Sequence, residues 1–206
     1  LANLAQRVHE AGMQLMVHAI GDAAVDLAMD ALEPVLAGGN PLRHRLEHIE
    51  VTPPDLVQRL ARSGVWACVQ PNFAGRWSRP GGMNGQRLGE ARLERCNAYR
   101  TLHEAGVPLA FGSDCMPLGP EIGLHGAIEH PIAAERLQPA VALGMYTEAS
   151  AQLVGCEAAP GRISPGCAAD LALLREDPRT ASGPPNVEAT FFAGRQVYGA
   201  EAIAEP

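Results

Sequence analysis

Short hydrophobic runs that end on a side chain suited to metal binding constrain the fold of this chain more than any other feature. The runs cover residues 14–18, 44–48 and 109–114, and they end on His18, His48 and Asp114. Segments with the apolar spacing of helices separate them. Parallel strands that alternate with helices bring their carboxyl ends to one edge, so side chains far apart in sequence become neighbours. The sequence therefore predicts an α/β fold whose rim carries two imidazoles and a carboxylate.

The expected elements alternate between strand and helix through most of the chain. Strands are expected over residues 14–18, 44–50, 66–70 and 109–113, and helices over residues 1–11, 22–36, 53–63, 97–105, 124–134 and 139–154. Thr52 is the expected N-cap of the helix that follows it, and Pro53 suits the first helical position. Residues 71–94 break the pattern, and a connection of that length is typical of a substrate-covering loop or a disordered insertion.

The carboxyl-terminal segment has a different pattern. A strand is expected over residues 170–174, and two further strands are expected on either side of a turn at Ala193-Gly194. We therefore expect two domains. Residues 1–154 form a strand-helix domain, and residues 155–206 form a β-rich segment.

Composition limits the classes of protein to which the chain can belong. The 206 residues are 47% hydrophobic and 19% charged, which is enough apolar content for a substantial core. The 16 basic and 23 acidic residues give a formal net charge of −7, which argues against a nucleic-acid-binding surface. The apolar stretches are shorter than the roughly 18 residues that a membrane span requires, so no membrane contact is expected.

The number and spacing of the cysteines indicate the redox state of the cellular compartment and do not match a known cysteine motif. All five are widely spaced and their number is odd, which is typical of neither a disulfide framework nor a paired-cysteine zinc motif. We therefore expect a reducing, cytoplasmic environment. For Cys115, which follows Asp114, a buried thiol without a chemical role is expected, and a position near a pocket is the alternative.

Five blocks of sequence carry a resemblance to a known family. They are VHAIGDAAVDLAMDALE, RHRLEHIEVTPPDL, VQPNFAGRW, LHEAGVPLAFGSDCMPLGP and GRISPGCAADLALLREDP. Together they resemble the carboxyl-terminal part of a metal-dependent amidohydrolase, in the branch that contains N-substituted formamide deformylases and exoenzyme regulatory proteins. The resemblance implies that the strands are the fifth to eighth of a TIM-like (β/α)8 barrel, with a small β-sandwich appendage to which residues 155–206 contribute. The N-terminal half of the barrel, with its His-x-His pair, has no counterpart among these residues.

The resemblance also implies a site. His18, His48 and Asp114 take the places of ligands of a divalent metal, for which zinc suits two imidazoles and a carboxylate. The implied reaction is hydrolysis by metal-activated water, with Asp114 as general base and then proton donor to the leaving nitrogen, and with a histidine such as His48 at the oxyanion. Gln70, Trp77 and His125 are the candidate contacts to substrate.

Other polar residues near these strands have more ordinary interpretations. His44 lies nearly a strand length from His48, so we interpret it as structural. Glu47 points opposite to His48 on a regular strand and is expected to face a covering helix. Glu50 returns to the face of His48, where either a substrate contact or a structural role is possible.

Two hypotheses of different classes remain from the sequence. The first is the carboxyl-terminal portion of a metal-dependent hydrolase that cleaves a carbon–nitrogen bond other than a peptide bond in a small amide or formamide. The second is an inactive or complementing fragment that functions only by association with another chain, such as the missing N-terminal half of the barrel or a second copy in a homo-oligomer. Cleavage of a lactone or phosphoester also remains open, because metal-activated water serves all these reactions.

Overall fold

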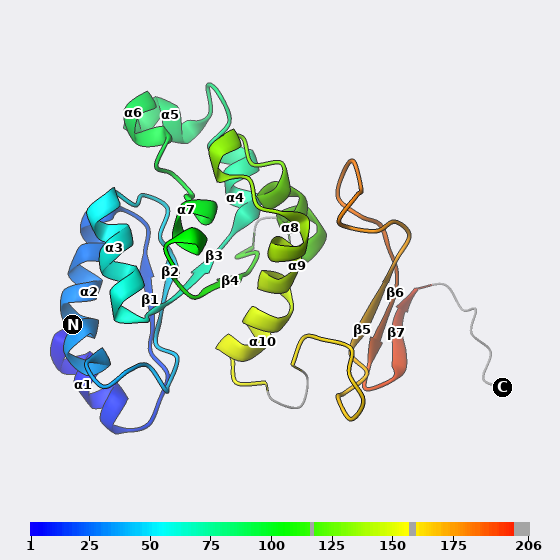
Figure 1. Cartoon of the computed structure of the whole chain (residues 1–206), viewed down its shortest axis with the longest axis horizontal. Helices are drawn as coiled ribbons and strands as arrows, with labels where there is room; N and C mark the ends of the chain where they lie inside the picture. The colour runs from blue at the N-terminus through cyan, green and yellow to red at the C-terminus, as the bar shows by residue number, and fades with distance from the viewer. Residues whose placement is uncertain (116–117, 157–159, 200–206) are drawn as a thin grey trace.

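A parallel four-stranded sheet forms the centre of the structure, a computed structural model that describes residues 1–115, 118–156 and 160–199. The strands lie in the order β1-β2-β3-β4 and are β1 (Met16–Ala19), β2 (Arg45–His48), β3 (Trp66–Val69) and β4 (Leu109–Phe111). Helices follow the strands along the chain, as Figure 1 shows. The predicted α/β class and each predicted strand are confirmed, with boundaries that shift by no more than two residues.

The helices lie close to the predicted segments. They are α1 (Ala2–Glu10), α2 (Asp22–Leu36), α3 (Pro54–Ser63), α7 (Tyr99–Glu104), α8 (Pro120–Ile128), the short 3-10 helix η1 (Ala133–Glu135), α9 (Pro139–Tyr146) and α10 (Glu148–Leu153). α3 begins one residue later than predicted, so Pro53 rather than Thr52 is its N-cap. The Thr52 amide donates to the Arg95 carbonyl, beside a bridge between Val51 and Cys96, and the Thr52 hydroxyl has no hydrogen-bond partner among the described residues, so it does not cap the helix.

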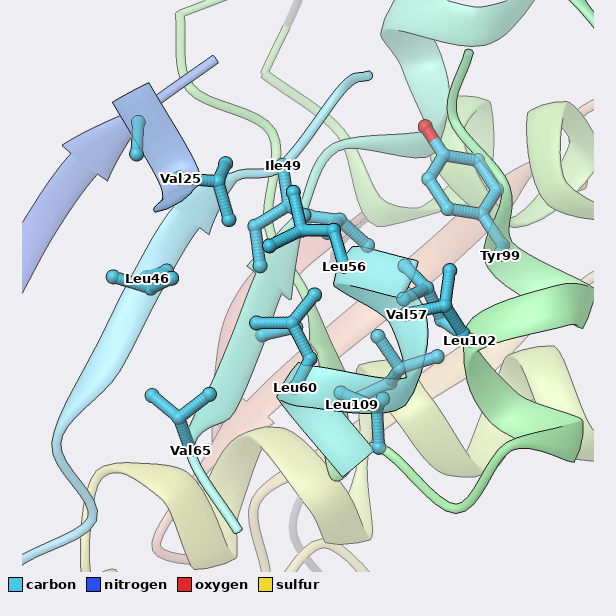
Figure 2. Close-up of a cluster of buried hydrophobic side chains, with 14 of the residues drawn as sticks. Val25, Leu46, Ile49, Leu56, Val57, Leu60, Val65, Tyr99, Leu102 and Leu109 are labelled. Atoms are coloured by element: carbon cyan, nitrogen blue, oxygen red, sulfur yellow. The ribbon is translucent and has the colours of Figure 1, made fainter. Parts of the chain in front are cut away.

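The core lies between one face of the sheet and the helices α2, α3 and α7. Leu46 and Ala67 on neighbouring strands are fully buried, and Leu56 and Leu60 of α3 pack into the same cluster. Figure 2 shows these α3 side chains gathered with Val25 of α2 and with residues of α7. Burial of this apolar face holds the strand-helix units together.

The other face of the sheet is less covered at β1 and β2. Met16 and His18 of β1 are exposed and lie in register with Arg45 and Glu47 of β2, which are partly exposed. Glu47 is therefore not directed at a covering helix, and that prediction was wrong. Its carboxylate accepts a hydrogen bond from Arg45 Nε at 2.5 Å, and the alternation of the strand turns both side chains away from the helices.

Residues 71–94 are helical, contrary to the irregular connection predicted. They form α4 (Pro71–Trp77), α5 (Met83–Leu88) and α6 (Glu90–Leu93). α4 packs against α8, where Gly126 lies so close to Pro71 that a Cβ would be 2.5 Å from its carbonyl oxygen. Pro71, part of the composition that resembled a loop, is thus the proline at the first turn of a helix, and Gly126 of α8 permits the close packing against it.

The carboxyl-terminal segment forms a separate antiparallel sheet. Its strands are β5 (Leu171–Leu174), β6 (Val187–Phe192) and β7 (Arg195–Gly199), in that order across the sheet. Ala193 and Gly194 join β6 to β7 with φ values of 49° and 82°, which confirms the predicted hairpin turn. In Figure 1 this sheet lies to one side of the parallel sheet.

No helix within the described ranges has both the length and the apolar character required to cross a lipid bilayer.

Candidate metal centre

The three candidate ligands come together at the carboxyl edge of the parallel sheet. The rings of His18 and His48 lie edge to face with their centroids 4.5 Å apart. His48 Nε2 lies 3.9 Å from Asp114 Oδ2, across a distance of 66 residues in sequence. His48 is 7% exposed, whereas His18 and Asp114 are open to solvent. The arrangement is a buried imidazole that faces an accessible imidazole and an accessible carboxylate.

Left-handed backbone conformations determine the directions in which the side chains of His48 and Asp114 point. His48 and Ile49 have φ values of 78° and 52°, and Asp114 and Cys115 have values of 44° and 60°. Strict alternation along β2 would direct His48 to the helix-covered face that Leu46 occupies. The left-handed turn at the strand end directs its ring to His18 instead. Such conformations are costly for residues other than glycine and are concentrated at functional sites.

Two neighbours fix the ring of His48. Its Nδ1 lies 2.8 Å from Oε1 of Gln70, a residue at the end of β3 that is only 4% exposed. Phe73 of α4 stacks on the ring at 6.0 Å between centroids, with planes 8° apart. Both neighbours follow β3 directly, so the order of the chain places them over the site.

Side chains from several helices hold the backbone that leads to Asp114. Asn72 Nδ2 donates to the Ser113 carbonyl at 2.9 Å, and Ser150 Oγ donates to the Phe111 carbonyl at 3.1 Å. Asn72 is 7% exposed, and its Oδ1 has no hydrogen-bond partner among the described residues. The sequence prediction missed Asn72, although its position three residues after the end of β3 is a signal of a rim residue.

Two imidazoles and a carboxylate are ligand types that divalent metals such as zinc accept, and one donor pair can be compared with the geometry of a bound site. Two ligands of one tetrahedral zinc are about 3.4 Å apart, given zinc–nitrogen distances of about 2.0–2.1 Å. The separation of 3.9 Å between His48 and Asp114 is close to that value. Within the part of the chain that the structure describes, no group of three or more His, Cys, Asp or Glu side chains is arranged so that it could hold a metal ion.

The sequence profile of the "Amidohydrolase family" matches residues 1–198. The chain belongs to the amidohydrolase family. It is 33% identical over 196 residues to the "Putative amidohydrolase YtcJ" of Bacillus subtilis, an alignment that covers 86% of this chain and 35% of that protein. It is 31% identical over 187 residues to the "N-substituted formamide deformylase" of Arthrobacter pascens, covering 85% of this chain and 34% of that enzyme.

Solved structures agree with this family. An uncharacterized metal-dependent hydrolase from Pyrococcus furiosus superposes with a TM-score of 0.70 and 28% identity over 81% of this chain and 34% of that one. A second such hydrolase, from Pyrococcus horikoshii, has a TM-score of 0.74 at 24% identity and covers 87% of this chain and 37% of that one. The chain thus spans about a third of the length of the amidohydrolases that it matches.

The candidate substrate contacts of this amidohydrolase chain lie at different distances from the ligands. Trp77 is half-buried on α4, with its ring centroid 4.5 Å from that of Phe73. Phe73 therefore links Trp77 to His48. His125 is half-buried on α8, and in the described ranges no hydrogen bond or ion pair joins it to the three candidate ligands. Gln70 bonds to His48 directly. Substrate binding by these residues stays a prediction.

Two further polar residues near β2 are buried. His44 is fully buried before β2, where its Nδ1 accepts the Leu15 amide at 3.0 Å and its Nε2 lies 3.0 Å from His9, in agreement with a structural role. Glu50 is buried beside Asn84 of α5, and burial raises the pKa of its carboxyl group.

The two cysteines near the site differ in environment. Burial, with the carboxylate of Glu47 beside it, raises the pKa of the Cys68 thiol to about 12, so it stays protonated at neutral pH. Cys115 is exposed, which contradicts the expected buried thiol. The left-handed turn at Asp114 and Cys115 carries that side chain outward.

Proposed function

We propose that this chain supplies the metal-binding rim of a hydrolase that cleaves a carbon–nitrogen bond, other than a peptide bond, in a small amide or formamide. The observation that carries the proposal is the meeting of His18, His48 and Asp114 at one strand edge, with His48 Nε2 3.9 Å from Asp114. The name of the 31% identical formamide deformylase supports the choice of bond.

The proposal includes an architecture. We assign β1 to β4 to the fifth to eighth strands of a (β/α)8 barrel, and the β5–β7 sheet to a β-sandwich appendage, with the domain boundary near residue 154. Two observations support this assignment. The strands β1 and β4 are the outer strands of the described parallel sheet, and the chain spans about a third of its relatives' length.

Each residue at the rim has its own role in the proposed reaction. When bound, a divalent metal such as zinc acidifies water and polarises the scissile carbonyl. His18 and His48 would hold it through their ring nitrogens, with Asp114 as the third ligand. Asp114 accepts the proton of the attacking water and returns it to the leaving nitrogen, so the proton count balances. His48, which faces the same carboxylate, is assigned with Asp114 to the catalytic pair, and Trp77 and His125 to the walls around the substrate.

A second candidate function is a complementing chain that is inactive alone. The described residues contain no group of three or more His, Cys, Asp or Glu side chains that could hold a metal ion, which favours a site completed by association with another chain. The partner would carry the other half of the barrel. Both candidates require the same three ligands and differ in whether this chain binds metal alone.

Metal content tests the proposal. We expect about one zinc ion per purified chain by elemental analysis, lost in the triple variant His18→Ala, His48→Ala, Asp114→Ala but retained in the control His103→Ala, Asp55→Ala, where both residues are exposed. Formamide and amide hydrolysis is then measured on the same samples. Metal that appears only when a chain with the other barrel half is added supports the complementing function, and absence of metal under both conditions contradicts both candidates.

A further inference from the structure

Gln70 is a buried residue whose side-chain amide is bonded at both ends. Its Nε2 donates to the Cys68 carbonyl at 3.2 Å, and its Oε1 lies 2.8 Å from Nδ1 of His48. The side chain is 4% exposed, so water does not compete freely for either bond. From the sequence, Gln70 is predicted only as a candidate contact to substrate.

The two bonds determine which nitrogen of His48 carries the proton. The Cys68 carbonyl has no hydrogen to donate, so it requires the amide NH2 group of Gln70. The Gln70 oxygen therefore faces His48, and because that oxygen only accepts hydrogen bonds, Nδ1 of His48 must carry the hydrogen. A neutral imidazole has one N–H, so Nε2 carries the lone pair and faces Asp114.

We propose that Gln70 is a positioning residue that fixes the Nδ1–H tautomer of His48 and thereby presents Nε2 to the metal. The inference rests on the proposed metal centre for its functional meaning. The tautomer itself is a property of the metal-free chain and is measurable without the metal.

A chain of buried hydrogen bonds fixes Gln70 in turn. The Tyr99 hydroxyl lies 3.0 Å from the Gln70 backbone carbonyl and 3.0 Å from Oδ1 of Asn97. Asn97 Nδ2 and Asn84 Nδ2 each donate to Ser78 Oγ at 3.0 Å. Burial raises the pKa of Tyr99 well above its ordinary value, so its hydroxyl keeps the proton that these carbonyl oxygens share.

This network connects the helical segment after β3 to the metal ligand. Ser78 and Asn84 of this network lie in the segment predicted to be a substrate-covering loop or a disordered insertion. That segment therefore helps to set the orientation of His48. Partners that orient a ligating histidine typically change metal affinity by about 10–100-fold when they are removed.

NMR of the imidazole nitrogens tests the inference. Spectra of the wild-type chain at about pH 8.5, where a free imidazole is neutral, are compared with those of Gln70→Leu, Gln70→Glu and the exposed control Gln58→Leu. We expect His48 to be protonated at Nδ1 in the wild type and the control, to lose this preference in Gln70→Leu, and to recover it in Gln70→Glu, whose carboxylate also accepts. Protonation at Nε2 in the wild type, or an unchanged tautomer in Gln70→Leu, would overturn the inference.

Cobalt titration separates this inference from the proposed function. We expect the dissociation constant for Co²⁺ to rise about 10–100-fold in Gln70→Leu and to stay near the wild-type value in Gln70→Glu. Equal cobalt affinity of the wild type and Gln70→Leu contradicts the positioning role. Failure of the wild-type chain to bind cobalt, with the Nδ1–H tautomer present, contradicts the metal centre and leaves the assignment of Gln70 to His48 in place. If Gln70→Leu does not fold, the tautomer of His48 in the wild type and in Gln70→Glu still tests the inference.

Discussion

Single residues at the rim combine strained backbone with few but specific polar partners. The left-handed conformations at His48 and Asp114 each cost on the order of 1–3 kcal/mol and persist only where the surroundings enforce them. Hydrogen bonds that involve Gln70 and Asn72 are among the enforcing contacts, because Gln70 Oε1 pairs with the ring of His48 and Asn72 donates to the carbonyl before Asp114. Their loss should therefore affect the site more than the fold.

Asn72 provides the first prediction at this scale. Asn72→Ala removes the donor to the Ser113 carbonyl, so we expect stability to fall by about 1 kcal/mol and the Co²⁺ dissociation constant to rise several-fold. Urea unfolding and cobalt titration measure the two effects. Asn186→Ala, at an exposed position of the C-terminal segment, is the control and should leave cobalt binding unchanged. Unchanged cobalt affinity in Asn72→Ala would show that the Asp114 backbone is held without this bond.

His130 provides a prediction of pH dependence. It is fully buried, and burial lowers its pKa to about 4. The unfolded chain, with an ordinary pKa near 6.5, binds a proton before the native state does, so stability is lost as the pH falls from about 6.5 to about 4. At pH 4.5 the loss from this residue is about 2 kcal/mol.

Urea unfolding at pH 7.5 and 4.5 tests whether the free energy of unfolding falls as the pH is lowered. The difference in the free energy of unfolding between the two pH values should be about 2 kcal/mol smaller in His130→Asn than in the wild type. The exposed His103→Asn should behave as the wild type. An equal pH dependence in His130→Asn would show that this imidazole titrates normally in the native state.

Neighbouring elements are joined by charged side chains as well as by the apolar core. Arg59 of α3 reaches three carboxylates on one face of α2, with Nε 2.8 Å from Glu33 and Nη2 2.6 Å from Asp30, and with Nη1 bonded to Asp26. This arrangement lowers the pKa of Glu33 through its hydrogen bond to the guanidinium. The fork geometry of arginine permits several bonds that lysine cannot reproduce together.

We therefore expect Arg59→Ala to lower stability by about 1 kcal/mol and Arg59→Lys to recover less than half of that loss. Thermal and urea unfolding at low and high salt measure the effect, which should shrink as salt screens the charges. Arg100→Ala removes a single exposed pair with Glu104 and should cost no more than about 0.5 kcal/mol. Equal losses in Arg59→Ala and Arg100→Ala would contradict a cooperative network.

A distant carboxylate caps α7. Glu135 of η1, 5% exposed, accepts the Thr101 amide at 3.0 Å and the Thr101 hydroxyl at 2.6 Å, whereas the sequence neighbour at the N-cap is Ala98. We expect Glu135→Ala to cost about 1–2 kcal/mol and Glu135→Gln to be intermediate, because the amide retains one acceptor. Denaturant unfolding measures both, with the exposed Glu129→Ala as the control. A loss in Glu135→Ala no larger than in Glu129→Ala would rule out the cap.

At the scale of the whole molecule, apolar surface remains uncovered on the β5–β7 sheet. Leu171 and Leu173 are 39% and 50% exposed, and the register places them on the face that also carries Ala189 and Phe191. Exposed apolar sheet faces favour association. This surface agrees with the proposed sandwich, in which a second sheet covers the face.

The isolated chain should therefore self-associate at micromolar concentrations. The double variant Leu171→Lys, Leu173→Lys should associate less, and its unfolding midpoint should stay nearly that of the wild type. Sedimentation velocity measures the first effect and thermal unfolding the second. Leu118→Lys, an exposed leucine away from this sheet, is the control and should associate as the wild type does. A wild-type chain that stays monomeric would contradict the expectation that this exposed apolar face drives association.

The periodic features of the chain were predictable from sequence because they depend on neighbours a few positions apart. Apolar runs located every strand, helical spacing located α2 and α3, and the Ala193-Gly194 pair marked the hairpin. The common rim for His18, His48 and Asp114 also followed, because parallel strands joined by helices place equivalent ends together. These features require only local periodicity and the handedness of the connections.

Tertiary structure decided the rest. Strand alternation alone directs His48 to the helix side, and only the left-handed turn at the end of β2 directs it to His18. The helices within residues 71–94, the cap from Glu135 and the bond from Gln70 to His48 all join segments that sequence proximity does not relate. The sequence by itself determined which strands and side chains reach the rim, whereas their orientation and protonation depend on polar partners that only folding brings within hydrogen-bond distance.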